Sequence, residues 1–117
     1  MAATKTARAL YNANPGANTT ASATEWNLST AYGGLLTVQI VNGASAPTTA
    51  PVVTVYTGNA TGVKRQLMQF SGDLVASSTN PYSISLPPAA MYVNVDVKGG
   101  ATNGSTFTVE GQELTSV

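Results

Sequence analysis

The side chains that could do chemistry are few, and the two most versatile kinds are missing. The chain of 117 residues has neither histidine nor cysteine, so a Ser–His or Cys–His nucleophile pair cannot form. The same absence removes the commonest metal ligand and the thiolate, and it makes a disulfide framework impossible. Catalysis would have to depend on the carboxylates, of which there are five: Glu25, Asp73, Asp96, Glu110 and Glu113.

A carboxylate pair could hydrolyse a glycosidic bond only if both members faced one cleft. Asp96 and Glu110 come nearest to this pattern, because both fall on outward positions of predicted strands that could be neighbours. We favour the simpler interpretation that they are two solvated surface charges. Glu110 and Glu113 supply too few oxygen ligands for a calcium loop. The sequence therefore predicts no catalytic residue, no metal site and no cofactor.

Basic residues are equally sparse. Lys64 and Arg65 form the only basic pair, which could contact an acidic patch but which we interpret as the solubilising beginning of an edge strand. Charged residues make up 9% of the chain and the net charge is zero, whereas about 25% is usual. Without a basic field, we predict no nucleic-acid partner and no membrane partner. A surface of zero net charge promotes association, which suits a protein that sits against neighbours.

The elements that position these residues are predicted to be β-strands. Apolar residues recur at every second position in short segments, and turn-forming Gly, Pro and Asn-Gly pairs separate the segments. Trp26 and Leu28 are expected to face inward, as are Met68 and Phe70, and Gly111 marks an expected irregularity in the last strand. The predicted strands cover residues 25–29, 36–40, 53–56, 65–70, 82–86, 91–98 and 107–112 or 107–114.

This pattern predicts an all-β protein with seven to eight strands in a two-sheet antiparallel β-sandwich, immunoglobulin-like or jelly-roll. Residues 22–117 would form the β-sandwich domain. Residues 1–21 differ in composition and form either an N-terminal strand or an arm that extends a neighbour's sheet. We favour a strand from about residue 4 to residue 12.

Apolar residues on outward strand positions are the candidates for partner or oligomer contacts, because tyrosine and apolar side chains are enriched at interfaces. Basic residues of the N-terminal segment and of the basic pair could add polar contacts. The predicted contact residues are Lys5, Arg8, Tyr11, Leu35, Val41, Tyr56, Lys64, Arg65, Leu67 and Tyr92.

The chain resembles small β-sandwich virion proteins of tailed bacteriophages, namely capsid decoration or cement proteins and related tail or neck accessory proteins. The similarity covers about residues 22–114. It lies in the kinds of segment and in their order along the chain, and no diagnostic motif is part of it. The segments that carry it are Glu25-Trp26-Asn27-Leu28, the run from Gly33 to Gly43 with the Pro/Thr/Ala loop after it, the strand from Ala90 to Val97, and the end from Val109 to Leu114.

This resemblance implies a protein without catalysis that forms oligomers, often trimers, at symmetry axes of a shell. We therefore predict a virion structural protein, made in the host cytoplasm, whose partner is the major capsid protein or another virion protein. A capsid decoration subunit is the first hypothesis, and a tail, collar or fibre-attachment protein is the second. A carbohydrate-binding module, with exposed tyrosines stacking on sugars, is an alternative of another class.

Overall fold

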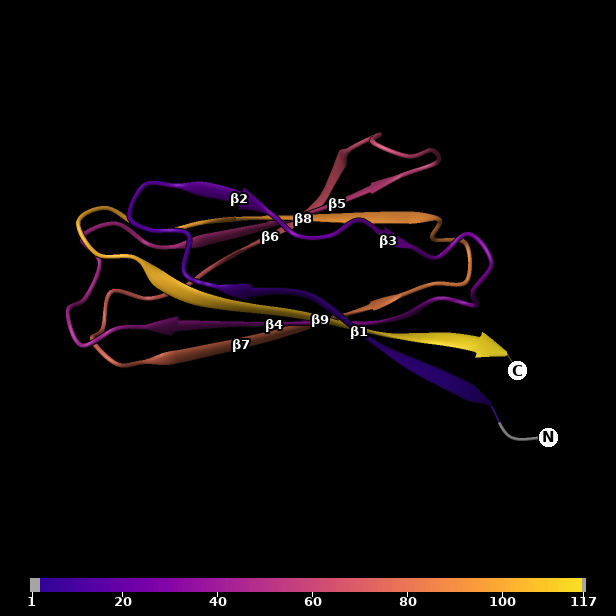
Figure 1. The fold of residues 1–117 in the computed structure, drawn as a ribbon, viewed down its shortest axis with the longest axis horizontal. Coiled ribbons are helices and arrows are strands. Elements are labelled where there is room, and N and C mark those ends of the chain that lie inside the picture. The colour runs from indigo at the N-terminus through magenta and orange to yellow at the C-terminus, as the bar shows by residue number, and fades with distance from the viewer. Residues whose placement is uncertain (1–2, 117) are drawn as a thin grey trace.

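The computed structural model describes residues 3–116, which form nine β-strands in two antiparallel sheets. The two sheets lie as facing layers (Figure 1). This described part of the chain contains no helix long and apolar enough to cross a membrane. The strands are β1 (Thr4–Ala13), β2 (Thr20–Ser22), β3 (Trp26–Asn27), β4 (Gly34–Asn42), β5 (Val52–Gly58), β6 (Arg65–Ser71), β7 (Thr79–Leu86), β8 (Tyr92–Lys98) and β9 (Ser105–Ser116).

The order of the strands decides between the two predicted kinds of sandwich. Sheet A has the order β1-β9-β4-β7, and sheet B has the order β2-β8-β5-β6 with β3 also paired to β8. The pairs β1–β9, β2–β8, β4–β7 and β5–β6 are nested in the sequence, as if one long hairpin were wound around the core. This is the jelly-roll arrangement. The immunoglobulin-like alternative, which has a different strand order, is wrong.

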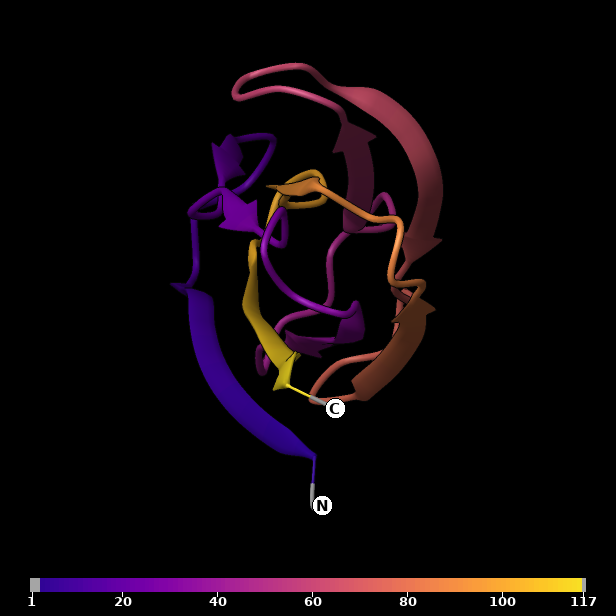
Figure 2. The same ribbon diagram turned by 90° about the vertical axis from the view of Figure 1, so that its right-hand side faces the viewer.

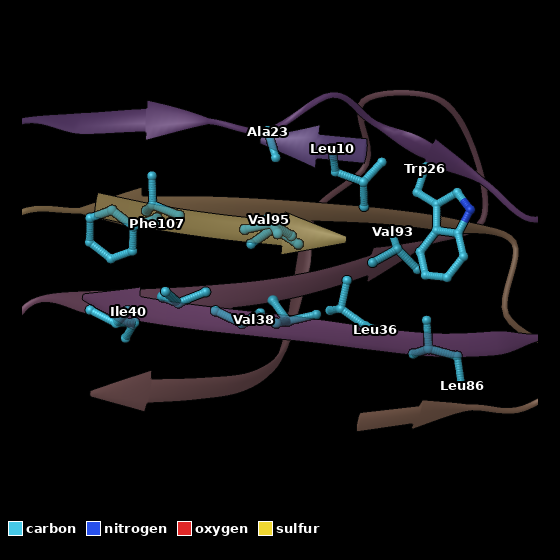
Figure 3. Close-up of a cluster of buried hydrophobic side chains, with 14 of the residues drawn as sticks. Leu10, Ala23, Trp26, Leu36, Val38, Ile40, Leu86, Val93, Val95 and Phe107 are labelled. Atoms are coloured by element: carbon cyan, nitrogen blue, oxygen red, sulfur yellow. The ribbon is translucent and has the colours of Figure 1, made fainter. Parts of the chain in front are cut away.

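Side chains from both sheets meet in one apolar core (Figure 3). The predicted inward positions are confirmed on most strands, because alternate residues of a strand point to the same face. The core residues are Leu10, Ala23, Trp26, Leu28, Leu36, Val38, Ile40, Val53, Val55, Leu86, Val93, Val95, Val97, Phe107 and Val109.

The structure has one strand more than the seven or eight predicted. The additional strand, β2, is short and polar and lies at the edge of sheet B, so no apolar alternation signals it. β1 covers the predicted N-terminal strand and pairs antiparallel with β9 along its length, with a register shift between Ala9 and Tyr11.

Two other expectations are corrected. Gly111 keeps a regular register with both neighbouring strands, and the register shifts between β1 and β9 lie elsewhere, at Thr4/Lys5 and at Ala9/Tyr11. Met68 was expected to face the core, yet 39% of it is exposed. The strand that carries it, β6, is an edge strand, and only Phe70 on it is half-buried.

A buried polar network closes one end of the sandwich. The Asn42 side chain is 1% exposed and its Nδ2 donates to the main-chain oxygens of Asp73 and Val75, both at 3.0 Å. Its Oδ1 accepts a hydrogen bond from the Ser105 hydroxyl at 2.7 Å. These bonds satisfy a polar side chain that would be costly to bury alone, and they fix the connection between β6 and β7.

Candidate functional site

A buried carboxylate at the end of β9 is the most unusual polar group in the structure. Glu113 is 6% exposed, and its Oε1 accepts hydrogen bonds from Arg8 Nε at 2.6 Å and from Trp26 Nε1 at 3.0 Å. A buried charge is tolerated when it is paired and hydrogen-bonded, and both conditions hold here. The cluster joins β1, β3 and β9, and therefore connects the two sheets.

This cluster was not predicted from the sequence, although the alternation of β9 contains a signal for it. Glu113 is in phase with Phe107, Val109 and Gly111, all of which face inward. Gly111 makes room for the Trp26 ring, because a Cβ added there would lie 2.7 Å from Trp26 Cζ2. The cluster is therefore part of the packing between the sheets.

The carboxylates that came nearest to a catalytic pair are not neighbours. Asp96 lies on β8 of sheet B, whereas Glu110 lies on β9 of sheet A, so the expectation of neighbouring strands is wrong. Asp96 accepts hydrogen bonds from the Ser22 hydroxyl at 2.7 Å and from Lys64 Nζ at 3.3 Å. Glu110 is an exposed side chain on the outer face of its sheet.

Hydrogen bonds lower the pKa of three carboxyl groups below their ordinary values. A general acid at neutral pH needs a raised pKa instead, so none of the three is suited to that role. Within residues 3–116, no cluster of three acidic or other metal-ligating side chains gathers. For each of these three carboxyl groups, one hydrogen bond lowers the pKa most. The donor is the Arg8 guanidinium for Glu113, the Gly62 N–H for Glu25 and the Ser78 hydroxyl for Asp73.

The predicted contact residues of sheet A do not form one surface. Lys5 and Leu35 lie together on its outer face, where they line a cavity of about 410 Å³. Val41 is half-buried at the other end of β4. Arg8 points to Glu113, and Tyr11 packs against the core.

The predicted contact residues of sheet B separate into two groups. Tyr56 and Lys64 lie together, with Lys64 Nζ 5.6 Å from the centre of the Tyr56 ring. Arg65 and Leu67 line a different cavity, at the edge strand β6. Tyr92 is half-buried at the beginning of β8. Lys64 precedes the edge strand β6 and Arg65 opens it, so the predicted position of the basic pair is confirmed.

The edge strand β6 is joined to β5 by a hairpin that arches over the outer face of sheet B (Figure 2). The Gly62 N–H donates to Glu25 Oε2 at 2.9 Å, and Lys64 reaches Asp96 on β8, so both contacts hold this hairpin over the face. At its other end β6 is fixed to β7, because the rings of Phe70 and Tyr82 stack with their centres 4.7 Å apart.

An apolar groove opens at the edge of sheet B, between the contacts of the hairpin and the Phe70–Tyr82 stack. This β6 groove has a volume of about 420 Å³ and lies between β6 and the turn from β7 to β8. Leu67 is 47% exposed and is the extra residue of a register shift opposite β5. Its lining includes Arg65, Leu67, Leu86, Pro87 and Met91.

Comparisons with known proteins place the fold but not a family. No family model matches the sequence, and no curated protein sequence matches it. Solved structures do share the fold. The PBSX exported protein XepA has 16% sequence identity and a TM-score of 0.60, and the SPBc2 prophage-derived protein YomS has 19% identity and a TM-score of 0.53.

The similarity to XepA and the similarity to YomS cover different shares of those two phage-derived proteins. The similarity covers 96% of this chain and 37% of XepA, and it covers 97% of this chain and 96% of YomS. CBM29_1, a family 29 carbohydrate binding module from Piromyces equi, is 12% identical with a TM-score of 0.52, over 93% of this chain and 91% of that module. Identities this low show a common fold, and function must be argued from the surface of this chain.

Proposed function

We propose that this protein is a non-enzymatic virion structural subunit, made in the host cytoplasm, that decorates an assembled phage shell through the β6 groove. The observation that carries this proposal is the groove itself. It combines an apolar floor with an edge strand whose outer backbone groups have no neighbouring strand within sheet B. An edge of this kind accepts an extended segment of a partner as an additional strand.

The chemistry of the groove indicates the kind of segment it accepts. Leu67 and Met91 offer exposed apolar surface, which would be covered by an apolar side chain of the partner. Arg65 lines the same groove and makes no ion pair within residues 3–116. We therefore expect an extended, partly apolar segment with an acidic residue, contributed by the major capsid protein.

A passive binding mechanism follows from this geometry. One groove buries little area, so a single contact would be weak. Several subunits joined as a homo-oligomer, which we propose to be a trimer, would bind a symmetric shell with avidity. A subunit that binds only the assembled shell stabilises it by mass action.

The experiment mixes the purified protein with undecorated capsids and measures the fraction that sediments with them. We expect co-sedimentation, and a loss of at least tenfold in affinity for Leu67→Glu, because the change places a charge in the apolar groove. Leu74→Glu is the matched control, since Leu74 is 53% exposed and does not line the groove. Failure of the unaltered protein to sediment with capsids would contradict the proposal.

Two measurements test the finer parts of the proposal. Light scattering gives the solution mass, and a monomer at all concentrations would contradict the trimer. Electron microscopy of labelled particles gives the location. Label over the whole shell is expected for a decoration subunit, whereas label at one vertex would support a tail, collar or fibre-attachment protein instead.

A further inference from the structure

The outer face of sheet B carries a second groove, on the side of the sheet that faces away from the core. This groove has a volume of about 330 Å³ and crosses β2, β8, β5 and β6. The strand register places its polar side chains in rows, since Asp96 lies beside Thr54 and Thr54 lies beside Gln69. The lining of this sheet B groove includes Thr20, Thr54, Tyr56, Gln69, Asp96 and Lys98.

Hydrogen bonds fix three polar side chains of the groove, those of Thr54, Gln69 and Asp96, before any ligand arrives. Gln69 Nε2 donates to Thr54 Oγ1 at 3.2 Å, and Thr54 is 9% exposed although its position faces outward. Asp96 Oδ1 accepts from the Ser22 hydroxyl at 2.7 Å and from Lys64 at 3.3 Å. A ligand that binds here loses little affinity to the ordering of these side chains.

An aromatic ring stands at one end of the groove. Tyr56 lines it from β5, and the Lys64 ammonium lies 5.6 Å from the centre of its ring. The same ammonium pairs with Asp96, so one lysine holds both the ring and the carboxylate in place. A fixed aromatic ring beside fixed hydrogen-bonding groups is an amphipathic surface, apolar on one part and polar on the other.

These features select the chemical class of the ligand. A strongly charged ligand gains little, because the carboxylate of Asp96 is already paired with Lys64. The other cation that lines the groove, Lys98, is an exposed ammonium, and an ion pair with it would be weak. A purely apolar ligand would leave the amide, hydroxyl and carboxylate groups without their water. A sugar ring fits both parts, because its C–H face packs on an aromatic ring while its hydroxyls both donate and accept hydrogen bonds.

We infer that the sheet B groove is a binding site for a neutral glycan. The sugar ring packs against Tyr56, and its hydroxyls bond to Gln69, Asp96 and Lys98. This inference goes beyond the proposed function, because the β6 groove opens at the edge of sheet B whereas the sheet B groove lies on the outer face. A subunit held on a shell by the first groove could bind a surface glycan with the second.

The test begins with an array of neutral oligosaccharides built from glucose, galactose, mannose, rhamnose and N-acetylglucosamine. The oligosaccharide that binds best is then titrated into labelled protein while the amide resonances are followed by NMR. We expect the amides of β5, β6 and β8 around the groove to shift. Tyr56→Ala should weaken binding at least tenfold, and Tyr56→Phe should retain most of it because the ring remains.

Tyr92→Ala is the matched control, because Tyr92 lies on the same strand as Asp96 but does not line the groove. Its affinity should equal that of the unaltered protein. The NMR spectra of all three variants show directly whether each is folded. No binding on the array and no amide shift at millimolar oligosaccharide would overturn the inference, and so would binding that Tyr56→Ala leaves unchanged. Capsid sedimentation is not part of this test, so the two proposals fail separately.

Discussion

Replacing Gly111 by alanine tests how the sheets are packed, because two effects of opposite sign meet at this position. Glycine inside a strand is about 0.5–1 kcal/mol less favourable than alanine, so alanine would ordinarily stabilise β9. Here the added Cβ would lie 2.7 Å from Trp26 Cζ2 and 2.8 Å from Cη2. The indole cannot move aside easily, since it is 2% exposed and its Nε1 is bonded to Glu113.

The size of the effect follows from these two terms. Overpacking a core costs about 1–3 kcal/mol, which outweighs the gain from removing a glycine. We expect Gly111→Ala to lower the free energy of unfolding by about 1–2 kcal/mol. In a Trp26→Leu background the shorter side chain cannot reach the new methyl group. There we expect the same change to raise stability by about 0.5 kcal/mol, so that the two positions are coupled by about 2 kcal/mol.

Urea unfolding followed by far-UV circular dichroism measures all four proteins of this cycle. Gly43→Ala is the control, because nothing lies within 4 Å of a Cβ added at Gly43. Trp26 is the only tryptophan, so its fluorescence reports separately whether the indole stays buried in Gly111→Ala. An equal loss of stability in both backgrounds would refute the reasoning, since the indole would then not be the cause.

Two further predictions concern the buried polar groups. Because the Arg8 hydrogen bond lowers the pKa of Glu113 below 4.5, its ionised form stabilises the fold above that pH and the benefit is lost as the pH falls through the lowered pKa. We expect Glu113→Gln to cost about 1–2 kcal/mol at pH 7 and less at pH 3 in urea unfolding; a cost independent of pH would contradict this. Asn42→Ala should cost about 2–3 kcal/mol by thermal unfolding, because it leaves several buried groups unsatisfied, while Asn59→Ala at an exposed position should change stability by less than about 0.5 kcal/mol.

The sequence predicted the kind of fold because burial of alternate residues is a local signal. Leu36, Val38 and Ile40 on β4, and Val93, Val95 and Val97 on β8, all face the core as expected. The polar strand β2 could not be predicted in this way, since it pairs with β8 without contributing a buried apolar row. The choice of the jelly-roll over the immunoglobulin-like order was open for the same reason, because alternation carries no information on which strands pair.

The candidate surfaces were predictable only in part. Tyr56, Lys64, Arg65 and Leu67 were recognised as residues that could make contacts, but their division between two grooves depends on the arched hairpin from β5 to β6. The role of Glu113 was missed, because its partners Arg8 and Trp26 are 105 and 87 residues away in the sequence.

By itself, the sequence determined that this protein is all-β, that alternate residues build its core, and that histidine and cysteine chemistry is absent. Composition and the spacing of neighbours fix these properties before the chain folds. Only the tertiary structure decided the strand order, the pairing of the buried carboxylate and the position of both grooves. Each of these arises where strands distant in the sequence meet, and such meetings are set by the packing of the whole molecule.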